Sequence, residues 1–406
     1  MRNESDKNAQ KKVCLIMGLG HTGCRVLESL AQIKGYSDID SVAVDTDSSD
    51  LALLESLRVR TLLLGQEAVG GHGTGGDQEQ AMHIIMDAAR NIEKEISGHR
   101  LLILVAALGG GTGGAAEEIL KIADEIMLPT VLLAVMPFYF ESNERKQRAE
   151  EMLSQMDNHC QVLVRVPNDK LLAQYAKNPA ADAFGRAADY LAKAAVCLST
   201  PFASDNLFNV TPCILNTLSS LDGNPRCLLA HAVCYSSDGL KDLKDLLGHQ
   251  YVFEDEHLKE SIDKAVALLR VSPQCREEEI DYAIRQTMEL LPDADCECAA
   301  CVDDEMSEFL AVTLLLHPSQ AAYSEEDEED ESEEAAELPE DATLPEPEMP
   351  APKRGRGKVN TSRQLQIPFE EDELGIFAGD PKNEWNGSNI DIPVFKRQRI
   401  TIDKGT

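Results

Sequence analysis

Three glycine-rich segments are the part of this chain that most clearly suggests chemistry: GLGHTG at 18–23, GGHGTGG at 70–76 and GGGTGG at 109–114. Glycine is entropically costly to order, so such dense runs indicate that the backbone must come close to something. Each segment follows an apolar run and precedes a helical pattern. Main-chain N–H groups at helix N-termini bind anions, and three sets of them meeting at one place suit a polyphosphate. The sequence has no G-x-x-x-x-G-K-[ST] motif, so a Walker-type loop is not predicted.

The first segment, taken by itself, matches the G-x-G-x-x-G fingerprint of dinucleotide-binding folds. Asp40, Asp45 and Asp47 follow at roughly the distance of a ribose-binding acid. A dinucleotide fold needs only one glycine-rich phosphate loop, however, and this chain has three. An oxidoreductase that binds NAD(P) through Gly18, Gly20 and Gly23 is therefore the weaker hypothesis, and tight strand-to-helix turns without a ligand are the plainest alternative.

The elements that must position these segments alternate along the first half of the chain. Strands are expected at 12–20, 39–47, 61–65, 99–108 and 129–138, with helices at 24–33, 78–96 and 114–126 between them. Nearly all-apolar strands that alternate with helices predict a parallel sheet covered on both faces. Ligands of such sheets bind where the C-terminal ends of strands lead into helices. The predicted fold is therefore a Rossmann-like parallel-sheet domain.

A long helix around 180–196 is expected to join this domain to a smaller α+β domain. There we expect a strand at 226–235, helices near 255–270 and 276–291, and a β-hairpin over 294–317. The predicted organisation is a flexible arm 1–11, a nucleotide-binding domain 12–180, a central helix 181–197, a connector 198–222, a second domain 223–318, a linker 319–388 and a C-terminal peptide 389–400.

The net charge of −33 is unevenly distributed along the chain. Residues 321–350 contain 14 acidic side chains and no basic one. Such a segment cannot bury enough apolar surface to offset the entropy of ordering, so a disordered, self-repelling linker is predicted. The overall acidity also argues against non-specific nucleic-acid binding.

Eleven cysteines, an odd number with apolar neighbours, predict reduced and mostly buried thiols. CECAAC at 296–301 raises a metal hypothesis, but strand thiols are favoured because no second Cys/His pair follows at zinc spacing. The sequence contains no apolar run long enough for a membrane span, and its start lacks the apolar core of a signal peptide. A cytosolic protein without direct membrane insertion is expected.

Six motifs, in order and at the expected spacing, resemble the tubulin/FtsZ family. GGGTGG after the strand LLILVAAL resembles the signature G-G-G-T-G-[ST]-G, one residue short. The others are AVDTD at 43–47 (AVNTD in the family), GHGTGGDQE at 71–79 (GLGAGANPE), PFYFESNER at 137–145 (PFxFEGxxR), VPNDKLL at 166–172 (IPNDKLL) and DAFGRAADYL at 182–191 (DAFGAANDVL). The chain is identified as a divergent member of this family.

The resemblance implies GTP or GDP as the ligand, together with Mg²⁺, for which no protein ligand is assigned. It places Glu141 at the ribose, Asn168 near the sugar and base, and Arg145 beside the nucleotide. It also implies that Phe184 stacks on guanine and that Asp189 accepts its N1–H and N2–H, since only guanine offers two adjacent donors there. The nucleotide-binding residues it implies are Gly20, His21, Thr22, Gly23, Cys24, Arg25, Asp45, Gly73, Thr74, Gly75, Gly76, Gly109, Gly110, Gly111, Thr112, Gly113, Glu141, Arg145, Asn168, Phe184 and Asp189.

The chain departs from the family at the loop that completes the catalytic site of the next subunit. There FtsZ-like proteins usually carry N-x-D-x-x-D, but the ungapped register places LFNVTPCIL (207–215) at this loop. Asn209 matches the Asn, whereas Thr211 and Ile214 hold the acidic positions. Asp205 could substitute only in a rebuilt loop. Asn209 and Asp205 are thus the candidate catalytic residues, and lost carboxylates predict hydrolysis slowed by on the order of 10²–10⁴.

Smaller departures surround the phosphates. Arg25 stands where the family has Asn, and His21 and Thr22 replace glycines. Asp45 also stands in place of Asn, and its extra negative charge would either favour Mg²⁺ or disfavour phosphate. Glu117 and Glu118 replace a Pro-apolar pair, where they suit helix N-terminal electrostatics.

The C-terminal segment DIPVFKRQ at 391–398 is similar to the DIPxFLRxQ peptide that follows a disordered linker in bacterial members of the family. Its apolar–Pro–apolar core suits docking into a groove. The resemblance implies binding to FtsA-like or ZipA-like membrane adaptors, and the candidate contact residues are Asp391, Ile392, Pro393, Phe395 and Arg397.

The implied function is a GTPase whose subunits stack head to tail into the filaments of the cytokinetic ring, at the division site on the inner face of the membrane. A heterologous contact that does not close makes such filaments. The alternative is a non-hydrolysing GTP-binding scaffold, or a co-polymerising relative, for which Thr211 and Ile214 are the support.

Overall fold

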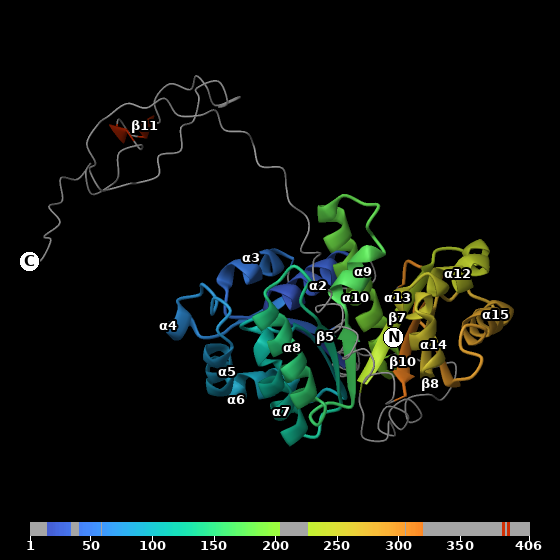
Figure 1. Ribbon diagram of the computed structural model, residues 1–406, viewed down its shortest axis with the longest axis horizontal. Helices are drawn as coiled ribbons and strands as arrows, with labels where there is room; N and C mark the ends of the chain where they lie inside the picture. The colour runs from blue at the N-terminus through green and yellow to red at the C-terminus, as the bar shows by residue number, and fades with distance from the viewer. Residues whose placement is uncertain are drawn as a thin grey trace, which may run out of the picture. The chain divides into compact units, whose positions relative to one another are not determined.

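The computed structural model describes residues 14–33, 40–57, 59–203, 226–304, 306–319, 384–385 and 388–389. Ten strands form one sheet in the order β3-β2-β1-β4-β5-β6-β7-β10-β8-β9. Of these strands, Figure 1 labels β5, β7, β8 and β10. The first six in this order are all parallel. They are β1 (Cys14–Leu19), β2 (Ser41–Asp45), β3 (Arg60–Leu63), β4 (Leu101–Ala107), β5 (Thr130–Val135) and β6 (Val162–Val166). The parallel sheet expected from the sequence is therefore confirmed.

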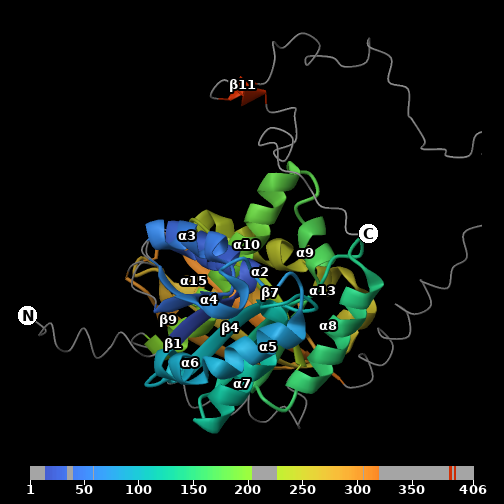
Figure 2. The same cartoon turned by 90° about the vertical axis from the view of Figure 1, so that its left-hand side faces the viewer.

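Helices cover both faces of this parallel region, as Figure 2 shows. The elements are α2 (Gly20–Gln32), α3 (Ser48–Ser56), α4 (Gln66–Val69), α5 (Gln78–Asp87), α6 (Ala89–Ile96), the 3-10 turn η1 (Gly113–Ala115), α7 (Ala116–Glu125), α8 (Asn143–Met156) and α9 (Asn168–Ala173). One apolar cluster joins the sheet to α2 and α3, and another joins it to α5, α6, α7 and α8. The single helix predicted over 78–96 is interrupted at Ala88, and both of its halves are buried in the second cluster.

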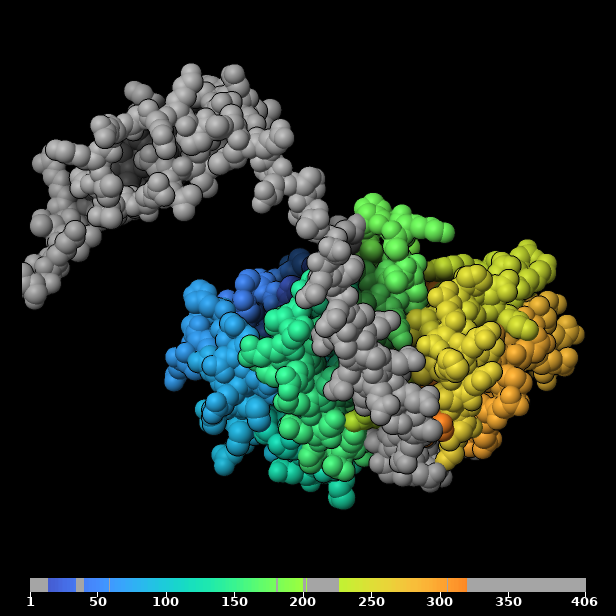
Figure 3. All heavy atoms as spheres, in the orientation of Figure 1, coloured from blue at the N-terminus to red at the C-terminus, as the bar shows by residue number. Residues whose placement is uncertain are grey.

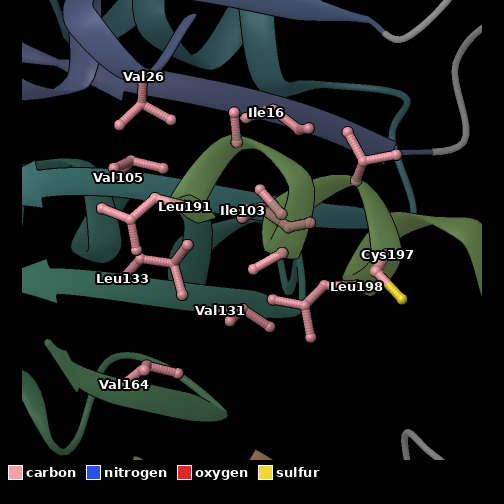
Figure 4. Packing of buried hydrophobic residues seen from close by; sticks show 14 of the residues in the cluster. Ile16, Val26, Ile103, Val105, Val131, Leu133, Val164, Leu191, Cys197 and Leu198 are labelled. Carbon is pink, nitrogen blue, oxygen red and sulfur yellow. The ribbon is translucent and has the colours of Figure 1, made fainter. Parts of the chain in front are cut away.

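The central helix α10 (Ala180–Ala203) is longer than the segment 181–197 expected from the sequence. It contributes Leu191 and Leu198 to the same apolar cluster as Val105 and Leu133 of the sheet (Figure 4). That cluster also includes Leu268, from the second half of the sheet. α10 thus packs against strands from both halves of the sheet. In the space-filling view its green atoms lie between the teal and the yellow atoms (Figure 3).

The second half of the sheet mixes parallel and antiparallel pairs. Its elements are β7 (Arg226–Cys234), η2 (Ser237–Asp242), α12 (Leu243–Gly248), α13 (Tyr251–Glu254), α14 (Glu256–Glu260), β8 (Ile262–Val271), α15 (Glu277–Met288), β9 (Asp295–Val302) and β10 (Leu310–Pro318). β7 pairs in parallel with β6, so the second domain extends the first sheet rather than forming a separate one.

Two predictions for this half are wrong. The helix expected near 255–270 ends at Glu260, and β8 follows it. The β-hairpin expected over 294–317 does not form either, because β8 lies between its two strands, antiparallel to β10 and parallel to β9. Both errors have one cause. IDKAVALLRV is almost continuously apolar, and a strand buried on both faces cannot be told from a buried helix by periodicity.

Two short strands, β11 (Glu384–Trp385) and β12 (Ser388–Asn389), form an antiparallel pair in a separate unit at 338–406. The pair lies where the predicted linker 319–388 meets the predicted peptide 389–400. The arm 1–11, almost all the rest of the predicted linker, and the peptide residues Asp391, Ile392, Pro393, Phe395 and Arg397 lie outside the described residues.

The cysteines that the structure describes are free thiols. Cys296 and Cys298 lie on β9, as predicted, and are half-buried. In the parts of the chain that the structure describes, no group of three or more His, Cys, Asp or Glu side chains is placed to hold a metal. Among the same residues, none of the helices is both long and apolar enough to cross a bilayer.

Candidate functional site

The turn after β1 leaves no room for side chains. α2 begins at Gly20 directly after the strand, and Gly20 has φ +69°, which disfavours any other residue. A Cβ on Gly18 would overlap the carbonyl oxygen of Gly23, so these two glycines let the helix pack onto its own strand. A Cβ on Gly20 would lie 2.9 Å from the main-chain nitrogen of Gly113. The first and third glycine segments therefore touch.

The second glycine segment is tied to the end of β2. The Gly73 N–H donates to the Thr46 carbonyl oxygen over 3.1 Å, and the Ser48 N–H donates to that of Gly71 over 2.9 Å. Thr46 and Thr112 hydroxyl oxygens are hydrogen-bonded at 2.7 Å in the buried interior. A Cβ on Gly111 would overlap Oγ1 of Thr74. All three glycine segments thus converge at the C-terminal edge of the parallel sheet.

Two buried polar atoms at this convergence have no hydrogen-bond partner among the described residues: Oγ1 of Thr74 and Nε of Arg145. A buried polar group without a partner costs about 1–3 kcal/mol, so such atoms point to a ligand that would satisfy them. Both atoms adjoin the third segment, since a Cβ on Gly109 would overlap the Arg145 carbonyl oxygen. The cradle therefore has main-chain donors, a hydroxyl and a guanidinium, the set that binds phosphate.

A chain of contacts leads from this cradle to an aromatic group. Nη1 of Arg145 lies 2.6 Å from Oε2 of Glu141, whose Oε1 accepts from the Phe138 N–H at 3.0 Å. The rings of Phe138 and Phe184 meet edge to face, 5.6 Å between centroids. Phe184 remains 47% exposed, so its ring is accessible for stacking on a base.

Asp189 lies on α10, five residues after Phe184. Its Oδ1 accepts from the Ser29 hydroxyl of α2 at 3.4 Å, and its Oδ2 pairs with Nζ of Lys193 at 2.9 Å. Asn168 is the first residue of α9, and the neighbouring Asp169 accepts from the Tyr139 N–H at 2.8 Å. Glu141, Asn168, Phe184 and Asp189 thus lie on three segments: the loop before α8, the start of α9, and α10.

Other residues named from the sequence have neighbours of their own. His21 Nδ1 lies 2.9 Å from Asp50 Oδ1, and Arg25 pairs with Glu28 at 2.6 Å. Glu117 and Glu118 both pair with Lys121 at 2.8 Å in the first two turns of α7. Asp205, Asn209, Thr211 and Ile214 lie outside the described residues.

Asp45 is only 3% exposed at the end of β2. Burial raises the pKa of its carboxyl to about 6, against the opposing effect of N–H groups from Thr46 and Asp47 that donate to Oδ1. The thiol of Cys24 lies 3.8 Å from Oδ2. A carboxylate so deeply buried near the phosphate cradle is costly to ionise.

Replacing Asp45 with Asn should therefore stabilise the protein in a pH-dependent way. The unfolded state ionises Asp45 near pH 3.8 and the folded state near pH 6, so stability is lost as the pH rises between these values. Asp45→Asn should gain about 2–3 kcal/mol at pH 8 and about half of that at pH 5. Urea denaturation at both pH values measures this, with exposed Asp87→Asn as the control. An equal gain at both pH values, or a loss, would contradict it.

Two residues that contact Asp189 were not predicted from the sequence. Lys193 and Ser29 hold Asp189 but belong to no motif. The contact of Lys193 could have been predicted, because Lys193 stands four residues after Asp189 on a predicted helix, and opposite charges at this spacing pair. The contact of Ser29 could not, since only the packing of α2 against α10 brings it there.

Comparisons with known proteins show what this chain is similar to. Residues 13–176 match the family profile described as Tubulin/FtsZ family, GTPase domain. The chain is similar to the cell division protein FtsZ of Helicobacter pylori, 30% identical over 198 residues that cover 48% of this chain and 51% of that protein. It is also similar to FtsZ of Methanothermobacter thermautotrophicus, 25% identical over 319 residues, 78% of this chain and 82% of that protein. The match thus spans about half the length of the Helicobacter protein.

Solved structures show the same fold. An empty FtsZ dimer from M. jannaschii aligns with a TM-score of 0.62 at 22% identity, over 79% of this chain and 93% of the other. A protofilament of CetZ2 from Haloferax volcanii, bound to GTPγS, aligns with a TM-score of 0.60 at 20% identity, over 80% of this chain and 100% of the other.

Proposed function

We propose that this chain, which is a divergent member of the tubulin/FtsZ family, binds GTP or GDP where its three glycine segments meet and polymerises head to tail. The observation that carries the proposal is the convergence of these segments around two buried, unpartnered polar atoms, those of Thr74 and Arg145. A ligand with several anionic oxygens would satisfy both atoms.

The residues fit a nucleoside triphosphate. Main-chain N–H groups of the first and third segments, with Thr74 and Thr112, would hold the phosphates, since hydrogen bonds to charged groups are the stronger kind. Glu141 and Asn168 would contact the sugar. Phe184 would stack on the base, and Asp189 would accept two hydrogen bonds from guanine.

Mg²⁺ is expected to reach the site with the phosphates rather than through a protein cage. Mg²⁺ keeps several waters and binds one or two carboxylates plus phosphate oxygens. Asp45 is an acidic residue of the predicted site at the end of β2, but its buried, reluctantly ionised carboxyl makes it a poor first ligand.

Filaments follow from a contact between different faces of successive subunits. In the proposed assembly, the nucleotide edge of one subunit meets the 207–215 segment of the next. Thr211 and Ile214 offer no carboxylate to orient the attacking water, so we propose slow hydrolysis at this interface. A scaffold that binds GTP and does not turn it over is the second candidate, favoured by the same two residues.

The acidic linker and the DIPVFKRQ peptide support a tethering role. We propose that the peptide docks into an FtsA-like or ZipA-like adaptor, which would hold the filament at the division site on the inner face of the membrane.

One experiment tests the proposal directly. The full chain is incubated with GTP, GDP or no nucleotide, then sedimented while released phosphate is measured in parallel. We expect pelleting that requires GTP and phosphate release far slower than polymerisation. Pelleting with no detectable release would select the scaffold. No affinity for guanine nucleotides, or binding without self-association, would overturn the proposal.

A further inference from the structure

Lys193 of α10 contacts Asp189 and reaches toward the second half of the sheet. Its Nζ lies 2.9 Å from Oδ2 of Asp189 and donates to the hydroxyl of Tyr235 over 3.2 Å. The same ammonium group lies 5.8 Å from the centre of the Tyr235 ring, within cation–π range. Tyr235 directly follows β7, so one lysine links the proposed base-reading carboxylate to the second domain.

The side chain of Lys193 is largely buried, and its ammonium group is paired. Its side chain is only 14% exposed, whereas that of Asp189 is 39% exposed. Desolvation acts to lower the pKa of Lys193, yet the contacts with Asp189 and Tyr235 leave it above its usual value. Lys193 therefore stays charged, and the carboxylate beside it remains accessible to a ligand.

The two contacts of Asp189 leave each of its carboxylate oxygens able to accept one more hydrogen bond. A carboxylate oxygen has two lone pairs. Lys193 occupies one on Oδ2 and Ser29 occupies one on Oδ1, which leaves one on each oxygen. Two adjacent acceptors in one plane are what N1–H and N2–H of guanine require. With only Ser29, at the longer distance of 3.4 Å, the carboxylate could rotate about its own bond.

Lys193 borders a cleft of about 590 Å³ whose lining includes Asp189, Tyr190, Lys177, His231 and Gln250. The Tyr190 hydroxyl donates to the side-chain oxygen of Gln250 over 2.9 Å. This hydrogen bond joins two of the residues that line the cleft. Lys193 is the side chain that reaches from this cleft to Tyr235.

We infer that Lys193, anchored by Tyr235, is a positioning residue that holds Asp189 in the orientation that selects guanine. Through it, the second domain contributes to base specificity. This inference rests on the proposed function, because it assumes that a guanine nucleotide binds beside Asp189. It predicts a change in the choice between bases, not merely a change in stability.

The test compares GTP with ITP, whose base lacks the 2-amino group and so makes one hydrogen bond fewer to Asp189. The wild-type chain should bind GTP roughly 10- to 100-fold more tightly than ITP, the effect of one hydrogen bond to a charged group. Lys193→Met should reduce this ratio by roughly 3- to 10-fold, since a mobile carboxylate makes the second bond poorly. Tyr235→Phe should reduce it by less, and Lys193→Arg should largely restore it.

Lys177→Met is the matched control, since Lys177 lines the same cleft with the same charge, and the contacts described for Asp189 are with Ser29 and Lys193. It should leave the GTP/ITP ratio unchanged within about twofold. A ratio unaltered by both Lys193→Met and Tyr235→Phe, with GTP still bound, would overturn the inference. Tyr235 is exposed, so its variant folds even if Lys193→Met does not. A wild-type chain that binds neither nucleotide would instead overturn the proposed function.

Discussion

Replacing Gly113 with alanine is expected to weaken GTP binding by on the order of 100-fold, the effect of losing one or two hydrogen bonds to phosphate. A Cβ at this position would overlap the carbonyl oxygen of Ala107 and lie 3.2 Å from the Ala107 nitrogen. These are backbone atoms of β4, an inner strand that cannot yield. The start of η1 must therefore move, and the N–H groups of the third glycine segment move with it. Overpacking of this kind should also lower the free energy of unfolding by about 1–3 kcal/mol.

The adjacent glycine provides the control. A Cβ on Gly114 would meet only side-chain carbons, Cγ of Gln78 at 3.4 Å and Cε of Met152 at 3.5 Å. These are ordinary contacts, so Gly114→Ala should bind GTP within a few-fold of the parent. GTP titration and urea denaturation of both variants measure the difference. If the two alanines behave alike, the third segment does not act as a rigid phosphate cradle.

Much of the nucleotide half could be predicted from the sequence because its signals are local. β1, β2 and β4 are short apolar runs that give way to glycine or polar residues, and such a run followed by a helical pattern has few alternatives. The convergence of the glycine segments follows from parallel strands, whose C-terminal ends share one edge. The order of the motifs along the sequence and the parallel topology are therefore enough to predict this part of the fold.

The second half depends on tertiary context instead. β8 is buried on both faces, so its residues show neither the two-residue period of a strand nor the 3.6-residue period of a helix. A helix in place of β8 leaves β9 and β10 as neighbours, which predicts the hairpin that does not form. Likewise, the burial of Asp45 depends on residues packed around it, such as Cys24, and not on its own motif. Such features become visible only when the packing is known.

Restoring the two missing acids should raise GTP turnover by on the order of 100-fold, from the rate contributed by general-base and water-orienting carboxylates. The variant is Thr211→Asp with Ile214→Asp, which converts N-V-T-P-C-I into the family pattern N-x-D-x-x-D. Phosphate release at a fixed amount of sedimented polymer isolates the chemical step from assembly. Pelleting with GTP should be little changed, because the acids act on water between subunits that already touch.

Charge and polarity can be separated by a second pair of substitutions. Thr211→Asn with Ile214→Asn adds polar side chains of nearly the same size but no carboxylate, so it should release phosphate as slowly as the parent. Asp205→Ala in the parent tests whether the 207–215 loop has been rebuilt so that Asp205 supplies the acid. If Asp205→Ala abolishes a substantial turnover, and the double Asp variant adds nothing to the parent rate, then Asp205 already serves as the acid. The opposite outcome is slow turnover in the parent, no change in Asp205→Ala and a large gain in the double Asp variant. It would mean that this chain kept the nucleotide cradle and lost only the catalytic half of a shared site.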